Sequence, residues 1–180
     1  MDINYFKESE EKCWKLLNDF NDATKVFNEI GRTAEKSCID VTGTSINRLG
    51  EKRKYGVELK NRNLNLMDDG RISGCTNNGN IFYDDTIFIE THKAGSMLLN
   101  SIDGFEPIYI NFLADGHIII FNLNKLSKRP KQSKNLNIKS QGYGKFEIAK
   151  REGLYLVDAA IYNKEYKLVK RVGEEWITKQ

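Results

Sequence analysis

Three residues of the sequence have types and a spacing that suit metal-assisted chemistry: Asp40, Glu58 and Lys60. If the strands that hold the two carboxylates pair, Asp40 and Glu58 face the same space. Two carboxylates, completed by water and phosphate oxygens, suit Mg²⁺ because this ion prefers hard oxygen ligands and keeps several waters. Lys60 follows Glu58 by two residues, so in a strand its amine lies on the same face and can hold or activate a water. The three residues therefore predict hydrolysis of a phosphodiester bond.

The strand that would hold Glu58 and Lys60 is the segment 55–63. Side chains of a strand alternate between two faces, which separates the apolar Val57 and Leu59 from the charged residues. The charged face consists of Glu58, Lys60 and Arg62. For Arg62 two roles stay open, a contact to phosphate and an ion pair with one of the carboxylates. The whole face also has a simpler interpretation, a charged strand that points into bulk water.

Other elements must position this strand. The segment 38–45 is rich in β-branched residues and predicts a strand that carries Asp40. A strand at 85–90 leads into a helix at 91–102. A hairpin follows, with strands 107–113 and 116–123 on either side of an Asp-Gly step.

The two ends of the chain complete the predicted order. Asp2 is predicted to cap a first helix, and a second helix is predicted from Asn21 or Asp22 to Gly31. The segment 64–80, which is rich in glycine and asparagine, predicts a flexible excursion. Further strands are predicted at 146–150, 154–160 and 166–172. This mixed order predicts an α/β fold layered around a sheet.

Residues 38–42 (CIDVT), followed by a turn and by Val57-Glu58-Leu59-Lys60, resemble the motif of the PD-(D/E)XK nuclease superfamily, which has the restriction-endonuclease-like fold. The family core runs αβββαβ, and the predicted order follows it from the first helices to Tyr109. The resemblance covers roughly residues 5–123. The resemblance implies a central mixed β-sheet flanked by helices. The residue before Asp40 is Ile39 rather than proline, which is a common variation in this family.

The resemblance also implies roles for individual residues. Asp40 and Glu58 would ligate Mg²⁺, for which Mn²⁺ would substitute, and Lys60 would assist the attacking water. The backbone carbonyl of Leu59 often completes such a site. Some members add a glutamate from the first helix. The candidates for it are Glu10, Glu11 and Glu29.

Glu90 and Lys93 lie where the strand 85–90 meets the helix 91–102. In the family an additional acidic or polar residue can face the site here, which makes Glu90 a candidate catalytic residue and Lys93 a candidate phosphate contact. In the alternative, Glu90 only begins or caps the helix and Lys93 is solvated. His92 can serve as a general base, but a lone histidine at a helix start is more often a surface residue.

The net charge of +3 is too small to establish a nucleic-acid partner, but the distribution of charge is informative. Between Asp115 and Glu147 there is no carboxylate, whereas seven lysines and arginines lie in this interval. Two interpretations stay open, a solvated loop and an electrostatic footprint for a phosphate backbone. The predicted nucleic-acid contacts are Arg62, Lys93, Lys128, Arg129 and Lys131.

Length and composition limit the class of protein. With 180 residues, of which 39% are hydrophobic, the chain predicts one domain. The resemblance implies a core at about 5–123, which leaves a basic loop at 124–145 and a C-terminal β extension at 146–180. No apolar run approaches the roughly 20 residues that span a bilayer. The acidic, mixed N-terminus is unlike a signal peptide. Three widely spaced cysteines favour reduced thiols over disulfides or zinc, so we expect a cytoplasmic protein.

Together these features predict a Mg²⁺-dependent endonuclease that cleaves DNA, double-stranded or branched, in preference to RNA. Many nucleases of this family act as dimers, so a homodimer is left open. The alternative from another class is a non-catalytic protein that binds nucleic acid or serves in assembly while keeping the fold, because fold alone does not fix function.

Overall fold

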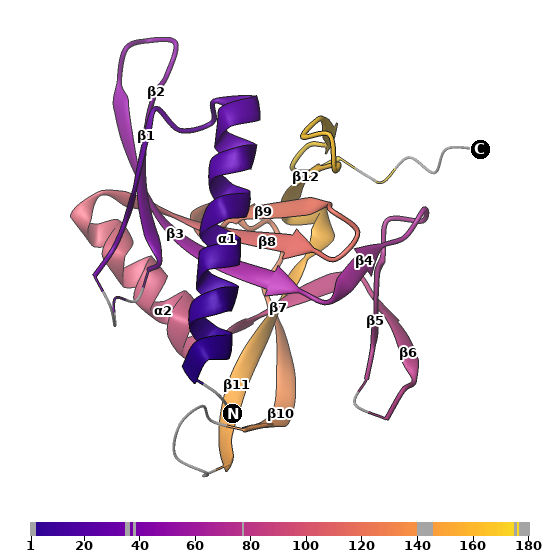
Figure 1. Ribbon diagram of the computed structural model, residues 1–180. Helices are drawn as coiled ribbons and strands as arrows, with labels where there is room; N and C mark the ends of the chain where they lie inside the picture. Colours follow the sequence, from indigo (N-terminus) through magenta and orange to yellow (C-terminus); the bar gives the residue numbers. More distant parts are fainter. Residues whose placement is uncertain are drawn as a thin grey trace.

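The computed structural model describes residues 3–34, 37, 39–76, 78–139, 146–174 and 176, and it has a mixed α/β fold around a central sheet (Figure 1). The predicted fold class is therefore confirmed. The helices are α1 (Ile3–Thr24), α2 (Thr91–Asn100) and the short 3-10 helices η1 (Ser101–Asp103), η2 (Leu123–Lys125) and η3 (Leu156–Asp158). Within the described ranges, no helix is long and apolar enough to cross a membrane.

The central sheet has seven strands in the order β1-β2-β3-β8-β9-β12-β13. Their bounds are β1 (Glu29–Arg32), β2 (Val41–Ile46), β3 (Lys52–Arg62), β8 (Phe105–Leu113), β9 (Ile118–Asn122), β12 (Ala159–Tyr162) and β13 (Leu168–Lys170). Strands β3 and β8 run parallel, with Glu58 opposite Tyr109, and the other neighbouring pairs are antiparallel. A parallel pair needs a crossover, and the chain makes it through β4 to β7 and α2.

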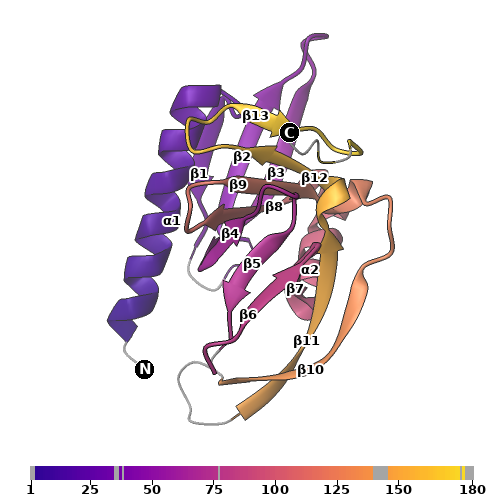
Figure 2. The same cartoon turned by 90° about the vertical axis from the view of Figure 1, so that its right-hand side faces the viewer.

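Two three-stranded sheets complete the fold. The first has the order β10-β11-β7, with β7 (Thr86–Glu90), β10 (Lys131–Lys139) and β11 (Phe146–Tyr155). The second has the order β4-β5-β6, with β4 (Leu64–Leu66), β5 (Ile72–Cys75) and β6 (Ile81–Asp84). Figure 2 shows β10 and β11 as a long hairpin that reaches beyond the central sheet, with β7 beside β11.

Helix α1 covers one face of the central sheet (Figure 1). Its Leu17 and Phe20 are buried in a core cluster that includes Val57 of β3. Met97 of α2 belongs to a second cluster, which includes Tyr109 of β8. Because neighbouring side chains of a strand point to opposite faces, the charged residues of β3 lie on the face away from α1.

The order α1, β2, β3, β7, α2, β8 contains the αβββαβ succession that the sequence predicts. Strand β1 and the sheet β4 to β6 are additions to this succession. The predicted hairpin around Asp115-Gly116 is confirmed, because β8 and β9 pair there. The third strand of the succession, β7, pairs with β11 and is not part of the seven-stranded sheet.

The predicted second helix from residue 21 or 22 to Gly31 is wrong. Helix α1 continues to Thr24, and Lys25, with a φ of 53°, leaves the helical conformation. The chain then forms β1, an edge strand on β2. One of the apolar residues whose spacing suggested a helix is Phe27, and its ring packs against Gly43 of β2. The packing is close, because a Cβ added to Gly43 would lie 2.8 Å from the ring. The predicted cap Asp2 lies outside the described residues.

The predicted flexible excursion at 64–80 is also wrong, because it holds β4 and β5 and leads into β6. Tight turns join these strands, with Gly70 and Gly79 at φ values of 81° and 80°. The N–H of Gly70 donates to the carbonyl of Met67 at 2.9 Å. An Asp-Gly step and an Asn-Gly step at these turns are ordinary hairpin signals.

The C-terminal third of the chain is built into the sheets. The segment 124–145, predicted as a loop, contains β10, and its residues 140–145 lie outside the described part of the chain. Strand β12 pairs with β9 and so extends the central sheet, and β11 pairs with β7. The strand predicted at 154–160 is divided among the end of β11, η3 and the start of β12.

Candidate functional site

Glu58 is the centre of the candidate site. Its side chain is 0% exposed, which is rare for a glutamate. It lies in β3 between two buried apolar residues, Val57 and Leu59, and opposite Tyr109 of the parallel strand β8. A buried carboxylate is costly unless opposite charge or hydrogen bonds compensate it. The neighbours of Glu58 must therefore supply that compensation.

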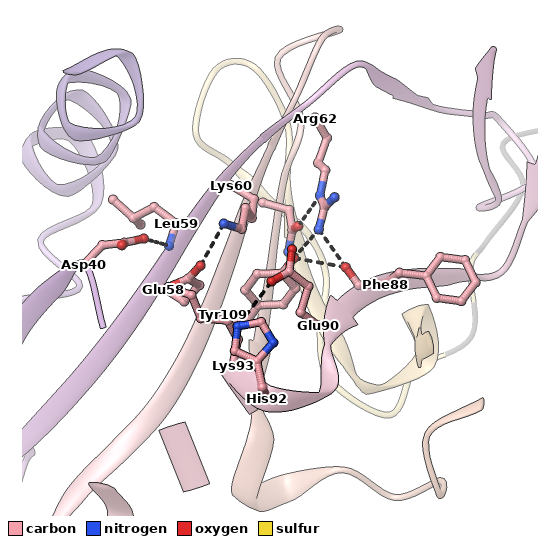
Figure 3. A network of polar contacts seen from close by, with 11 residues as sticks. Asp40, Glu58, Leu59, Lys60, Arg62, Phe88, Glu90, His92, Lys93 and Tyr109 are labelled. Carbon is pink, nitrogen blue, oxygen red and sulfur yellow. Dashed lines mark hydrogen bonds and ion pairs between the residues drawn. The ribbon is translucent and has the colours of Figure 1, made fainter. Parts of the chain in front are cut away.

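Two lysines supply it (Figure 3). The Nζ of Lys60 lies 2.8 Å from Oε1 of Glu58, and the Nζ of Lys93 lies 3.1 Å from Oε2. Burial opposes the charged form of Lys60, but the interactions with Glu58 together with the charges of Tyr109 and Asp40 outweigh this effect, so the pKa of Lys60 is raised. Both oxygens of the carboxylate thus face an ammonium group.

Asp40 lies one residue before β2. The antiparallel register pairs Val41 with Val57, and its continuation by one residue sets Asp40 opposite Glu58 on the same face. Oδ2 of Asp40 accepts a hydrogen bond from the N–H of Leu59 at 2.8 Å. Burial, and next to it the charge of Glu58, raises the pKa of Asp40 to about 6. The two carboxylates therefore repel each other across the strand pair.

A pocket of about 30 Å³ opens beside Glu58. One water needs about 10–15 Å³, so the pocket has room for an ion or about two water-sized atoms but not for a nucleobase. The charged residues that line it are Glu58, Lys60, Arg62, Glu90, Lys93 and Arg151. The pocket thus brings together β3, β7, α2 and β11.

Glu90 ends β7 and takes the N-cap position of α2, but its side chain makes no capping hydrogen bond. Its Oε2 lies 3.5 Å from Nε2 of His92, whose side chain is 69% exposed. Glu90 lines the same pocket as Glu58. The structure therefore brings Glu90 to the candidate site and leaves His92 at the surface. Figure 3 shows Glu90 on the opposite side of Glu58 from Asp40.

Arg62 is held by neutral groups. Its Nε donates to Oδ1 of Asn111 at 3.1 Å, and its Nη2 donates to the carbonyl of Phe88 at 2.6 Å and to the Tyr109 hydroxyl. Burial raises the pKa of Tyr109, and its hydroxyl donates to the same carbonyl at 3.1 Å. In the described ranges Arg62 forms no ion pair with either carboxylate. Its hydrogen bonds instead connect β3 with β7 and β8.

Lys93 is half-buried and paired with Glu58, so the alternative of a solvated side chain is wrong. The other predicted nucleic-acid contacts, Lys128, Arg129 and Lys131, are exposed and do not line the pocket of Glu58. Lys128 and Arg129 instead border a second cavity, of about 360 Å³, next to α2. The backbone N–H of Lys128 donates to Oδ2 of the buried Asp158 at 3.2 Å.

The three glutamates proposed as helical ligands do not line the pocket. Oε2 of Glu11 accepts a hydrogen bond from Arg32 at 2.7 Å. Glu29 belongs to β1 rather than to a helix, and its Oε2 lies 3.7 Å from Lys52. Glu10 is exposed on α1.

Asp40 and Glu58 suit a divalent cation by their chemistry. Oε1 of Glu58 is buried and has no aligned hydrogen bond within the described residues, although the ammonium of Lys60 lies near it. The raised pKa of Asp40 reflects its burial first and then the negative charge of Glu58. No group of three or more histidine, cysteine or acidic residues that could hold a metal occurs in the described ranges. A cation would thus depend on two carboxylates, water and phosphate oxygens, which suits Mg²⁺.

Sequence reasoning predicted Lys93 at the site but missed its partner, and it missed Arg151, Tyr109 and Asn111 as members of the site. The pairing of Lys93 with Glu58 joins α2 to β3, and no local pattern indicates it. Arg151 reaches the pocket from β11, far outside the predicted core. Asn111 and Tyr109 could have been predicted from the sequence, since the alternation of β8 sets both on the face opposite the apolar Ile110.

Comparisons with known proteins find few matches. No model of a protein family matches the chain, and no curated protein does. Among solved structures, four chains match. One of them is the 1.6 Å structure of Hjc, a Holliday junction resolvase from the archaeal hyperthermophile Archaeoglobus fulgidus. The similarity covers 80% of this chain and 84% of that chain, with 11% identity and a TM-score of 0.45.

Proposed function

We propose that this protein is a Mg²⁺-dependent endonuclease of the PD-(D/E)XK type that cleaves DNA, double-stranded or branched. One observation carries the proposal: the fully buried Glu58 has Lys60 at 2.8 Å and Asp40 opposite it on the neighbouring strand. A merely solvated charged strand would point Glu58 into bulk water, and the burial of Glu58 contradicts that interpretation.

Each residue has a part in the proposed reaction. Asp40 and Glu58 would hold the cation. When bound, Mg²⁺ polarises the phosphate and lowers the pKa of a bound water. Lys60 is charged at neutral pH because its pKa is raised, so it would act as a hydrogen-bond donor to the attacking water and to the oxygen that gains negative charge. Glu90 would add a further oxygen donor at the pocket.

The DNA would be held by basic residues at two distances from the cut. Lys93 uses one of its three N–H donors on Glu58, so the other two are available for a phosphate. Arg62 lines the same pocket. The exposed Lys128, Arg129 and Lys131 would contact the backbone farther away, where their contribution would fall with salt.

One observation favours the second candidate, a non-catalytic protein that binds nucleic acid or serves in assembly. Both oxygens of Glu58 already face ammonium groups, so the buried charge is balanced without a cation. On this account Glu58, Lys60 and Lys93 form a structural cluster. Cleavage would then be absent, whereas DNA binding by the exposed lysines would persist.

The test is incubation of the full chain with supercoiled, linear, single-stranded and four-way branched DNA, in Mg²⁺ and in EDTA. We expect cleavage of at least one substrate in Mg²⁺ and none in EDTA. Glu58→Gln, purified in parallel, should be inactive, which controls for contaminating nucleases. If none of the four substrates is cut with Mg²⁺ or Mn²⁺, or if Glu58→Gln cuts as wild type does, the nuclease proposal is wrong.

A further inference from the structure

A residue of the C-terminal third of the chain reaches the candidate site. Strand β11 pairs antiparallel with β7, and the register sets Arg151 opposite Glu90. Arg151 lines the pocket that holds Glu58. Strand β11 lies outside residues 5–123, on which the family resemblance rests, so the motif assigns no role to Arg151.

The pocket carries more positive than negative charge. Its lining includes four basic residues but only two acidic ones. Lys60 and Lys93 are both paired with one of the acidic residues, Glu58. The other acidic residue of the lining, Glu90, lies opposite Arg151 in the strand register.

The two arginines influence each other. Arg62 is fixed by neutral acceptors, the amide of Asn111 and the carbonyl of Phe88, which do not offset its positive charge. The pKa of Arg151 is lowered, mainly by burial and next by the charge of Arg62. Like charges in a partly buried pocket raise the free energy of the folded protein. An anion bound between them would remove this cost.

The size of the pocket limits which anion fits. About 30 Å³ has room for about two water-sized atoms. The two non-bridging oxygens of a phosphodiester meet this limit, whereas a nucleobase exceeds it. The planar guanidinium of an arginine binds two such oxygens through parallel N–H donors.

We propose that Arg151 binds a backbone phosphate of the cut DNA strand, next to the bond that is cleaved. This inference rests on the proposed function, because it assigns the phosphate to the pocket of Glu58 and Lys60. It makes β11 a part of the active site, so removal of the C-terminal strands would remove a substrate contact as well as part of the sheets.

The experiment compares Arg151→Gln, Arg151→Lys and a matched control, Lys150→Gln. Lys150 is exposed and is the neighbour of Arg151 in β11, so its side chain points to the opposite face while its removal costs the same charge. Binding of a fluorescent four-way DNA junction is measured by anisotropy in EDTA over a range of salt. Single-turnover cleavage is measured in Mg²⁺, and unfolding curves show that each variant is folded.

We expect Arg151→Gln to weaken junction binding about tenfold and to reduce the slope of log K against log salt by about 0.9, the value for one lost phosphate contact. Arg151→Lys keeps the positive charge but loses the two parallel N–H donors of the guanidinium, so its loss of binding affinity should be smaller than that of Arg151→Gln. Lys150→Gln should stay within about twofold of wild type in binding, because it is exposed on the opposite face.

The outcomes separate the two proposals. If the wild type cleaves and Arg151→Gln binds and cleaves equally well, or if Lys150→Gln loses as much as Arg151→Gln, the role of Arg151 is wrong while the nuclease function stands. If Arg151→Gln loses binding but the wild type cuts no DNA in Mg²⁺ or Mn²⁺, the phosphate contact stands and the nuclease function falls.

Discussion

The ammonium of Lys93 lies 3.1 Å from Oε2 of Glu58, across a separation of 35 residues in the chain. This contact joins the start of α2 to the middle of β3. Because Lys60 approaches the other oxygen, Glu58 is balanced by two positive charges before any cation binds. A cation that uses Glu58 must therefore compete with at least one ammonium group.

This competition predicts that Lys93→Met tightens binding of a divalent cation. At an effective dielectric constant of about 20, removal of one positive charge near the site is worth at least about 1–2 kcal/mol, or roughly tenfold in Kd. Isothermal titration with Mn²⁺ measures it. The control is Lys52→Met, which removes an exposed lysine of β3, the strand that holds Glu58, and should leave Kd unchanged. An equal or weaker affinity in Lys93→Met would contradict the competition.

A second prediction concerns the stability of the lysine pair. Glu58→Gln removes the carboxylate that the ammonium groups of Lys60 and Lys93 both face, and it should lower the free energy of unfolding by about 2 kcal/mol. This is less than the roughly 3–5 kcal/mol for a fully buried pair, because the lysine side chains are 38% and 24% exposed. Urea unfolding in EDTA measures it.

The double variant Glu58→Gln with Lys93→Met tests the origin of that loss. Since one of the two neighbouring ammonium charges is then removed, the double variant should be more stable than Glu58→Gln alone. Additive losses would show that the two residues are not coupled.

The raised pKa of Asp40 predicts that this residue lowers the free energy of unfolding in a pH-dependent way. Its carboxyl titrates at about 6 in the folded protein and near 4 in an unfolded chain. Below about pH 4 both states are protonated. As the pH rises from about 4 to 6, the unfolded chain loses its proton first, so the folded state loses stability, and above that range the loss is constant.

Asp40→Asn should therefore be more stable than wild type near pH 7.5 by up to about 3 kcal/mol, because a pKa difference of one corresponds to about 1.4 kcal/mol. The gain should vanish near pH 4. Unfolding curves in EDTA at both pH values measure it. The same variant should lose cleavage, as expected where a site sacrifices stability for function. A gain that persists at low pH would contradict the assignment to Asp40.

Substitution of Arg62 should lower the stability of the fold and not only weaken a contact to DNA. Its guanidinium holds Asn111, the carbonyl of Phe88 and the Tyr109 hydroxyl, and a lysine cannot reproduce that fork. Arg62→Lys should lower the free energy of unfolding by about 1–2 kcal/mol. Arg53→Lys is the control, since Arg53 is on the same strand in an exposed ion pair, 44% exposed, and should change stability by less than about 0.5 kcal/mol. Unchanged stability with weaker DNA binding would instead assign Arg62 to phosphate alone.

The sequence predicts the core of the site because its signals are local. Alternation along β3 separates Val57 from Glu58, and a short turn over residues 47–51 returns the chain so that Asp40 lies opposite Glu58. Both facts depend on residues close together in sequence. The parallel partner strand β8 follows from the αβββαβ order rather than from any single residue.

What the sequence does not predict depends on distant contacts. Phe27 has the spacing of a helix, but its ring packs on Gly43 and the chain continues as an edge strand. The strands β4 to β6 are short, so their apolar pattern is weak, although Gly70 and Gly79 mark their turns. The place of Arg151 depends on the pairing of β11 with β7, and the local pattern of β11 shows a strand but not its partner.

The most direct test of the central claim is single-turnover cleavage of a four-way DNA junction by Lys60→Ala in Mg²⁺, beside wild type and the Lys52→Ala control. We predict a loss of at least about 100-fold for Lys60→Ala, since a placed donor contributes about 10²–10³ to such reactions. Its junction binding in EDTA should stay close to that of wild type, and Lys52→Ala should cleave normally. The unfolding curve of Lys60→Ala should show a folded protein of lower stability, because Glu58 loses one of its two ammonium partners. Equal cleavage by Lys60→Ala and wild type would contradict the account.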